Sequence, residues 1–220
     1  MEWSEPIDAY CERVAPGFFG EPLNALSNFA FFVAAAYGLA LAKRERSDLA
    51  VWLLALLVGV IGLGSFLFHT FANRWSAMAD VIPITVFIYA YFAFALRQFL
   101  RLSWSLTGLV LGGLFAANAV IAWAAPPGLL NGSVGYLPAL LAAIGMALII
   151  RSRHHPASYH LAAAALVFAI SLAFRTADRV TCHAVPIGTH FVWHLLNALV
   201  LGLYLEAAAR FGSIAPLKKN

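Results

Sequence analysis

Histidine, aspartate and serine side chains interrupt three apolar stretches of this sequence. Ser65 and His69 are four residues apart near the end of one stretch, Asp80 lies early in the next, and His190 and His194 are four residues apart near the start of the last. A spacing of four places two side chains on one face of a helix, so each pair can point at a common centre. Three imidazoles with an open fourth position are the usual ligands of a catalytic zinc ion. The sequence therefore predicts a zinc site held by these three histidines.

Asp80 and Ser65 would add acid–base chemistry beside such a metal. Zinc lowers the pKa of a bound water to about 7, and a nearby carboxylate can accept the proton and pass it to a leaving group. Ser65, one turn before His69, would hold the water or stabilise an oxyanion. The implied reaction is metal-assisted hydrolysis of an acyl bond. Imidazole also suits copper, iron and nickel, but three histidines beside a carboxylate without a redox residue favour zinc.

A structural role is the alternative for each of these residues, because a single intramembrane His or Asp often makes a packing hydrogen bond or serves in a proton relay. An ionised Asp at the centre of a lipid-facing helix costs about 2.5 to 3.5 kcal/mol on insertion scales, so such residues usually face partners inside a bundle. The joint occurrence of all five residues weakens the structural alternative.

The composition assigns the chain to the membrane proteins. Of its 220 residues 62% are hydrophobic and 11% are charged, whereas a typical globular protein has about 25% charged residues. A membrane-spanning helix needs about 20 apolar residues. We therefore expect an all-α polytopic protein, a bundle of seven transmembrane helices. The expected spans are residues 23–42, 49–68, 78–96, 102–123, 134–150, 159–174 and 187–209.

The domain organisation follows from these spans. We expect an extramembrane amino-terminal segment (1–22), a seven-helix membrane domain (23–209) and a short tail (210–220). The first apolar run is too long for a removable signal peptide and lacks a basic leader, so its helix is expected to remain in the protein. The net charge of +4 comes from short basic clusters between apolar runs, which are typical topology signals, and this argues against nucleic-acid binding.

The basic residues also predict the orientation. An odd number of spans places the termini on opposite sides, and alternate loops share a face. The amino-terminal side then holds Arg13, Arg74, Arg175 and Arg179, and the other side holds Lys43, Arg44, Arg46, Arg97, Arg101, Arg151, Arg153, Arg210, Lys218 and Lys219. By the positive-inside rule the amino terminus is non-cytoplasmic and the carboxyl terminus is cytoplasmic. The five candidate site residues then lie at similar depth below the non-cytoplasmic face.

The motif Ser65-x-x-x-His69, Asp80 eleven residues later, and His190-x-x-x-His194 resembles that of the alkaline ceramidases. These enzymes belong to a seven-helix hydrolase superfamily that also contains the progestin and adiponectin receptors. The resemblance spans nearly the whole chain, and the predicted orientation is similar to that of ceramidases and opposite to that of adiponectin receptors. It implies zinc ligands at the three histidines, with Asp80 and Ser65 acting on the water and the transition state.

The amino-terminal segment carries a second resemblance, to the aromatic-Cys-Glu and Glu-x-x-Asn-x-x-Ser-Asn stretch of the family. In eukaryotic members this segment supplies a calcium site. The resemblance implies calcium candidates at Asp8, Tyr10, Glu12 and Glu21. Ala9 stands where the family has an acidic residue, and Val14 stands where it has Asn. Calcium sites take six to eight oxygen ligands, so an ordinary acidic extramembrane segment is the alternative.

The chain has two cysteines, Cys11 and Cys182, and both fall on the predicted non-cytoplasmic side. An even pair on an oxidising face predicts a disulfide that ties the amino-terminal segment to the mouth of the site, and the family resemblance implies the same. Two unlinked thiols are the alternative. Asp178, with Arg175 and Arg179, lies near the end of the sixth span. A solvated loop or an Arg–Asp clamp is expected there, and lining of the site entrance is the alternative.

The function indicated by these features is a zinc-dependent intramembrane amidase. Its substrate would be ceramide or a similar long-chain N-acyl lipid of the membrane, cleaved to a sphingoid base and a fatty acid. One alternative is a hydrolase of another acyl lipid. The other is a seven-helix receptor with a structural metal site, although structural zinc usually takes a fourth protein ligand. The compact size and short amino-terminal segment favour a bacterial inner or plasma membrane, with the site toward the non-cytoplasmic face.

Overall fold

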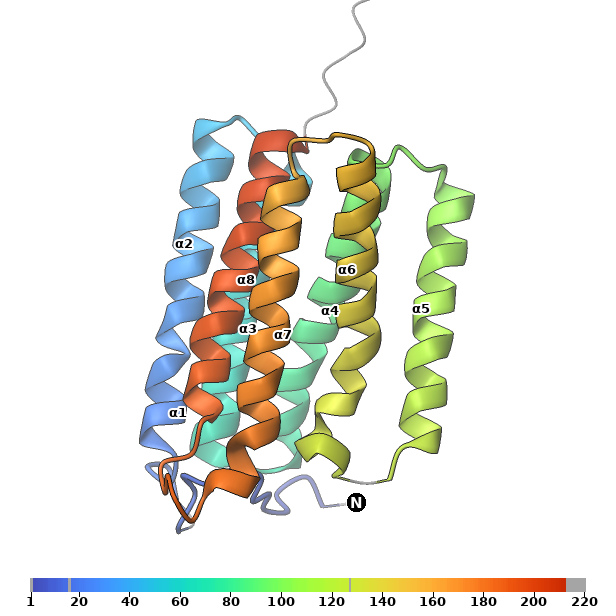
Figure 1. The fold of residues 1–220 in the computed structure, drawn as a ribbon. Coiled ribbons are helices and arrows are strands. Elements are labelled where there is room, and N and C mark those ends of the chain that lie inside the picture. The colour runs from blue at the N-terminus through green and yellow to red at the C-terminus, as the bar shows by residue number, and fades with distance from the viewer. Residues whose placement is uncertain (1, 16, 127, 213–220) are drawn as a thin grey trace, which may run out of the picture.

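The structure, a computed structural model, describes residues 2–15, 17–126 and 128–212. Within these residues seven helical segments are long and apolar enough to cross a membrane, and they pack side by side in one bundle (Figure 1). The prediction of an all-α protein with seven spans is therefore confirmed. The elements are α1 (Pro22–Ser27), α2 (Phe29–Arg44), α3 (Leu49–Phe71), α4 (Arg74–Gln98), α5 (Trp104–Ala124), the 3-10 helix η1 (Leu129–Tyr136), α6 (Leu137–Ser152), α7 (Ser158–Thr181) and α8 (His190–Phe211).

The helices form a closed ring in sequence order. Each of α2 to α7 packs against the next, and α8 closes the ring by packing on both α7 and α2. Helix α5 lies at the edge of the bundle (Figure 1), and Thr107 is its one buried residue. Helices α3 and α8 contribute many of the buried residues, including Val58, Ile61 and Leu205. The ring encloses the space in which the polar residues of the site meet.

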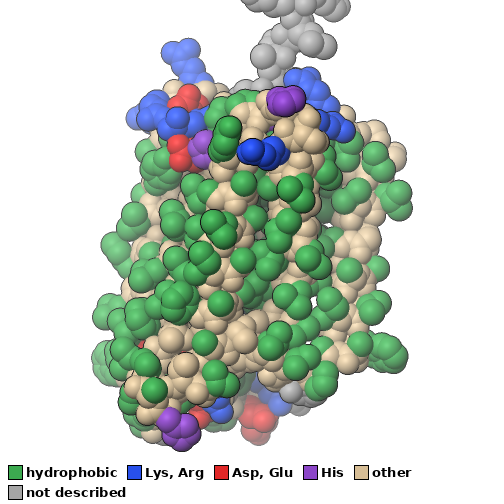
Figure 2. Space-filling model, in the orientation of Figure 1, with side chains coloured by type: hydrophobic (Ala, Val, Ile, Leu, Met, Phe, Trp, Pro, Cys, Tyr) green, Lys and Arg blue, Asp and Glu red, His purple; other side chains and the backbone are tan. Residues whose placement is uncertain are grey.

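The outer surface of the bundle is apolar, as contact with lipid requires. Large apolar side chains such as Leu53, Leu109 and Leu166 are exposed along the helices, and they cover the flank of the bundle (Figure 2). In the same view Lys and Arg gather at the end opposite the amino terminus. Because this apolar belt faces outward rather than inward, it fits contact with hydrocarbon.

The turn between α3 and α4 is set by local capping. Ala72 ends α3 in the left-handed conformation (φ 44°), and Asn73 then caps α4 reciprocally with Ser76: each side chain accepts a hydrogen bond from the other's backbone N–H at 3.1 Å. A reciprocal cap of this kind satisfies donors that a helix start leaves free. The tight turn keeps His69, near the end of α3, and Asp80, near the start of α4, at the same end of the bundle.

Several helices extend beyond the predicted spans. The largest difference is at α7, which continues to Thr181, whereas the apolar run predicted an end at residue 174. The added turns carry Arg175 and Asp178, which the apolar pattern did not assign to a helix. The expectation that Asp178 lies in a solvated loop is wrong, because its side chain is fully buried in α7.

Candidate metal centre and apolar cavity

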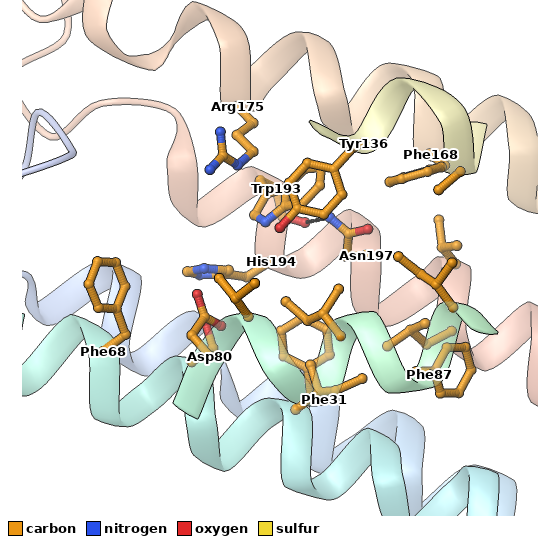
Figure 3. A pocket seen from close by; sticks show the side chains of 18 of the residues that line it. Phe31, Phe68, Asp80, Phe87, Tyr136, Phe168, Arg175, Trp193, His194 and Asn197 are labelled. Carbon is orange, nitrogen blue, oxygen red and sulfur yellow. Dashed lines mark hydrogen bonds between the residues drawn. The ribbon is translucent and has the colours of Figure 1, made fainter. Parts of the chain in front are cut away.

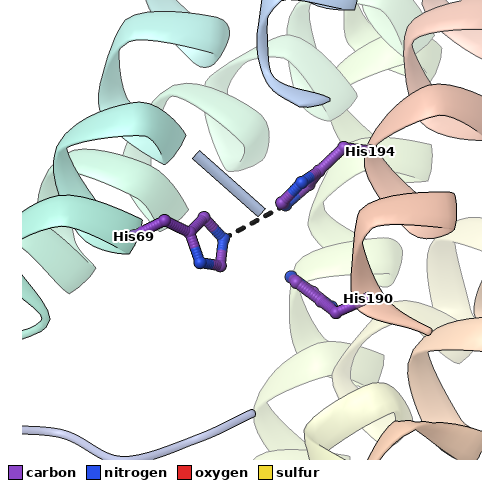
Figure 4. A group of neighbouring side chains, drawn as sticks. All are labelled: His69, His190 and His194. Carbon is purple, nitrogen blue, oxygen red and sulfur yellow. Dashed lines mark hydrogen bonds between the residues drawn. The ribbon is translucent and has the colours of Figure 1, made fainter. Parts of the chain in front are cut away.

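Three buried histidines converge at the end of the bundle that carries the amino terminus. His69 comes from α3, and His190 and His194 come from successive turns of α8 (Figure 4). One ring nitrogen of each lies within 4.8 Å of those of the others. Among the described residues this is the one group of three or more His, Cys, Asp or Glu side chains placed to hold a metal ion.

The hydrogen bonds of two of these histidines fix which nitrogen is free. The Glu21 carboxylate lies 2.5 Å from His69 Nδ1, and since a carboxylate is an acceptor, Nδ1 carries the proton. The Ser27 hydroxyl donates to the Asn24 carbonyl oxygen, so its oxygen accepts from His194 Nδ1, 2.7 Å away. Both Nε2 atoms are then left with lone pairs.

The remaining nitrogens fit a metal. The Nε2 atoms of His69 and His194 face each other at 3.1 Å, and two lone pairs at that distance repel unless a cation lies between them. His190 Nδ1 has no hydrogen-bond partner although it is buried, and its ring stacks on Tyr10 at 3.6 Å between centroids. Neutral imidazoles oriented by carboxylate or hydroxyl partners are typical of zinc ligands.

Glu21 is itself held by a positive charge. Arg13 Nε donates to Glu21 Oε1 at 2.5 Å, and the same guanidinium donates to the His69 carbonyl oxygen at 3.2 Å. Burial alone would raise the pKa of the Glu21 carboxyl, but hydrogen bonds from His69, Arg13 and Asn24 outweigh it and hold the pKa below its ordinary value. These contacts therefore favour the ionised form of Glu21 beside the candidate metal ligand His69.

Asp178 positions the start of α8. Its carboxylate accepts from the backbone N–H groups of Thr189 at 2.6 Å, His190 at 3.0 Å and Cys11 at 3.0 Å. The bonds from Thr189 and His190 satisfy donors at the amino-terminal end of α8, where a negative charge is stabilised by the helix dipole. One buried carboxylate thus joins α7, the first metal-candidate histidine of α8 and the amino-terminal segment.

The disulfide predicted from the cysteine pair is confirmed. Cys11 and Cys182 are bonded, directly beside the Asp178 hydrogen bond. The bond ties the amino-terminal segment to the end of α7, so that Tyr10 can lie buried against His190.

Ser65 and Asp80 each follow a residue at which α3 and α4 are in tight contact. Gly64 packs directly against the Ala79 carbonyl, and this contact brings the neighbouring residues together. Ser65 is buried and lines the same cavity as Asp80. Asp80 Oδ1 is buried without a hydrogen-bond partner, and the side chain points toward His194 across an open space (Figure 3). An unsatisfied buried carboxylate oxygen is a group that a water or a substrate can occupy.

That space is a cavity of about 250 Å³ inside the helix ring. Asp80, His190 and His194 lie at one end of it, and apolar or aromatic side chains from α4 and α8 continue the wall as far as Tyr91 and Tyr204. At 1.5 Å per residue, the wall formed by α8 runs for about 20 Å along the helix. The cavity thus combines a polar end at the histidines with a long apolar extension (Figure 3).

The four calcium candidates do not form one oxygen site. Both oxygens of Glu12 accept backbone N–H groups at the start of α1, and both oxygens of Glu21 are bonded as described above. Asp8 is exposed and pairs with Arg179 at 3.4 Å, while Tyr10 is buried against His190. The positively charged guanidinium of Arg13 lies beside Glu21, in the position that a calcium ion bound to Glu21 would need. The structure therefore gives calcium binding no support.

Sequence reasoning missed three residues that support the site. Glu21, a calcium candidate from the sequence, contacts His69 instead. Ser27, which the sequence offers only as the serine of the Glu-x-x-Asn-x-x-Ser-Asn stretch, contacts His194. Arg13, counted only as a basic residue in the orientation argument, binds Glu21. The available signal was the density of polar residues just before and within the first span. Such residues usually have a partner inside a bundle, but sequence spacing does not say which.

A comparison with protein families adds a separate finding. The family model described as Ceramidase matches residues 7–212, a range that covers nearly the whole chain and includes the residues of the candidate centre described above. No curated protein matches the chain.

Proposed function

Since the chain belongs to the ceramidase family, we propose that it is a zinc-dependent intramembrane amidase. Its substrate is ceramide or a similar long-chain N-acyl lipid, and its products are a sphingoid base and a fatty acid. The family match supports a ceramidase-type hydrolase, and the protein's own residues support the finer assignments. The single observation that carries them is the convergence of His69, His190 and His194 beside Asp80 at the end of an apolar cavity.

The centre is suited to hydrolysis rather than to metal storage. Three histidines leave a fourth zinc position open, as in catalytic sites. A zinc ion bound there would supply Lewis-acid chemistry, polarising the amide carbonyl and lowering the pKa of a water. Asp80, with its free Oδ1, accepts the proton of the attacking water and delivers it to the leaving nitrogen. Ser65, beside Asp80, donates a hydrogen bond to the carbonyl oxygen as charge develops on it.

The shape of the cavity determines how the substrate lies in it. The acyl chain lies along the apolar wall between α4 and α8, where Phe87 and Leu201 exclude water. The amide then lies at the histidines, and the head group lies at the end of the bundle that carries the amino terminus. Exclusion of water along the chain also strengthens the electrostatic contacts at the amide.

The orientation is part of the proposal. The disulfide and the histidine centre lie at the same end of the bundle, and disulfides persist in oxidising compartments. Basic side chains gather at the opposite end (Figure 2), as the positive-inside rule expects of a cytoplasmic face. The site therefore faces the non-cytoplasmic side of the membrane, which we assign to a bacterial inner or plasma membrane.

The test is hydrolysis of N-acyl sphingoid lipids by the purified zinc-loaded protein in detergent, with release of the sphingoid base as the readout. Asp80→Asn should reduce turnover by at least about 100-fold, because it removes the proton acceptor. Asp48→Asn is the matched control, since Asp48 lies at the other end of the bundle and makes no side-chain capping bond. Chelation should abolish turnover, and zinc should restore it. Full activity of Asp80→Asn or of the metal-free protein would overturn the proposed mechanism.

A further inference from the structure

Asn197 is a polar residue of the cavity wall that the proposed mechanism does not use. It lies in α8 three residues after His194, about 4.5 Å further along the helix axis. Its side chain lines the cavity (Figure 3). The residues of α8 that continue the same wall are Val200, Leu201 and Tyr204. Asn197 thus places an uncharged amide at the start of the apolar extension.

One hydrogen bond fixes which way this amide points. Asn197 Nδ2 donates to the Trp193 carbonyl oxygen at 2.9 Å. Since a carbonyl oxygen only accepts, the amide nitrogen must face it, and Oδ1 is directed away from the helix backbone. Oδ1 is not fully buried, and it accepts from no donor among the described residues. Asn197 therefore offers the cavity a hydrogen-bond acceptor in a fixed orientation.

A second asparagine shows the purely structural use of such an amide. Asn118, in α5, also donates to the carbonyl oxygen four residues earlier, that of Leu114, at 3.0 Å. Its nitrogen lies near the Tyr89 hydroxyl as well, at 3.4 Å, and its side chain is not part of the cavity wall. Asn197 makes the same bond to its own helix but keeps its acceptor on the wall of a space that fits a ligand.

The chemistry of this acceptor limits what it can recognise. An amide oxygen accepts hydrogen bonds and donates none, so its partner must carry an O–H or N–H group. A polar group covered by a plain hydrocarbon chain loses its contact with water and gains no bond in return, which is unfavourable. A chain with a hydroxyl group at this level would avoid that cost, whereas a methylene group would not.

The position of Asn197 identifies the part of the lipid that it meets. With the carbonyl carbon at the histidines, as the proposed function holds, the acyl chain runs along α8 toward Tyr204. An extended chain advances by slightly less than one carbon–carbon bond, about 1.5 Å, per carbon. The third carbon of the chain therefore passes near Asn197. A hydroxyl group on that carbon can reach Oδ1 at the usual O–H···O distance of about 2.7–2.8 Å.

We propose that Asn197 is a specificity residue for the acyl chain. Its Oδ1 accepts a hydrogen bond from a hydroxyl group on the third carbon, so the cavity prefers N-(3-hydroxyacyl) lipids over otherwise identical lipids with a plain chain. The inference rests on the proposed function for the placement of the chain. It leaves the head group and the reaction as they are, and it adds the chemical class of the acyl group: the products are a sphingoid base and a 3-hydroxy fatty acid.

The direct test is binding of three fatty acids, which the protein has no amide bond to cleave. They are hexadecanoic acid, 3-hydroxyhexadecanoic acid and 8-hydroxyhexadecanoic acid. Binding to the full-length zinc-loaded protein in detergent is followed by tryptophan fluorescence, since Trp193 lines the cavity. We expect the 3-hydroxy acid to bind about fivefold more tightly than the plain acid, the contribution of one hydrogen bond. The 8-hydroxy acid should bind more weakly than the plain acid, because its hydroxyl group would meet apolar residues such as Leu201.

Two variants assign that preference to Asn197. Asn197→Leu removes the acceptor at similar size, and it should bring the affinities for the 3-hydroxy and plain acids to a ratio close to one. Asn118→Leu is the matched control, because it removes the same kind of helix bond outside the cavity, and it should keep the ratio of the wild type.

Three results would overturn the inference: equal binding of the 3-hydroxy and plain acids by the wild type, tightest binding of the 8-hydroxy acid, or a preference that survives in Asn197→Leu. If Asn197→Leu fails to fold, the comparison of the three acids on the wild type still decides.

Turnover separates this inference from the proposed function. Sphingosine amides of the plain and 3-hydroxy acids are the cleavable pair, and the wild type should show a higher kcat/KM for the hydroxylated amide. An Asn197→Leu variant that loses activity by the same factor on both amides would assign Asn197 to the amide or the sphingoid hydroxyls and overturn the inference.

The two proposals can also fail separately. If the 3-hydroxy acid binds preferentially through Asn197 but no N-acyl lipid is hydrolysed, the proposed function fails and the acyl-chain preference stands. If both amides are hydrolysed at equal kcat/KM, the preference fails and the amidase function stands.

Discussion

The Glu21 carboxylate lies 2.5 Å from Nδ1 of His69, a residue 48 positions later in the chain. This contact decides that the His69 lone pair is on Nε2, the nitrogen that faces His194. Glu21 is in turn fixed by Arg13, so the amino-terminal segment sets the orientation of a candidate metal ligand in α3. The amino-terminal segment is therefore part of the candidate metal centre.

Glu21→Gln should weaken zinc binding. The amide retains the size of the carboxylate but loses the charge that orients and polarises His69, and changes of this kind typically cost about 10- to 100-fold in metal affinity. The measurement is zinc release to a competing chelator of known affinity. Glu5→Gln is the control, because Glu5 is an exposed residue of the same segment that pairs with Arg74. Unchanged zinc affinity in Glu21→Gln would contradict the role assigned to this contact.

Calcium should have no effect on the wild-type protein. Every carboxylate oxygen of Glu12 and Glu21 already accepts a hydrogen bond, from backbone N–H groups, Arg13, Asn24 or His69, so a calcium ion would have to compete with these donors. Lipid hydrolysis and thermal unfolding of the zinc-loaded protein, each measured with and without millimolar calcium, test this expectation. Magnesium at the same concentration controls for ionic strength. A stimulation specific to calcium would show that the segment rearranges to bind it.

The Cys11–Cys182 disulfide should stabilise the folded protein by about 2–4 kcal/mol. It links residues 171 positions apart and therefore restricts the unfolded chain strongly. Thermal unfolding in detergent should shift to lower temperature in the Cys11→Ala/Cys182→Ala double variant. A reducing agent should produce a similar shift in the wild type and none in the variant. An identical unfolding temperature with and without the bond would show that the remaining contacts of the amino-terminal segment suffice.

The sequence predicted the parts of this structure that depend on local pattern. Apolar runs predicted seven spans, and the i, i+4 spacing of His190 and His194 predicted their common direction, because both signals are properties of a single helix. The contacts of Glu21 with His69 and of Ser27 with His194 join residues 48 and 167 positions apart, and no local pattern encodes such pairs. Asp178 was misplaced because hydropathy ends a span at the first charges, whereas α7 continues and buries the carboxylate against the start of α8.

Gly64→Ala should disrupt the candidate catalytic pair, Ser65 and Asp80, although it changes neither of these side chains. A Cβ at this position would collide with the Ala79 carbonyl, which is backbone and cannot swing aside, so α3 and α4 must separate and carry Ser65 away from Asp80. We expect a loss of stability of about 1–3 kcal/mol, as for other overpacked cores, and a fall in hydrolysis larger than the fall in zinc affinity, because His69 lies more than one turn further along α3. The measurements are thermal unfolding, zinc competition and lipid turnover on the same preparation. Gly112→Ala in α5 is the matched control, since nothing lies within 4 Å of its Cβ position, and it should be neutral in all three. Wild-type behaviour of Gly64→Ala would show that the close approach of the two helices is not what positions Asp80.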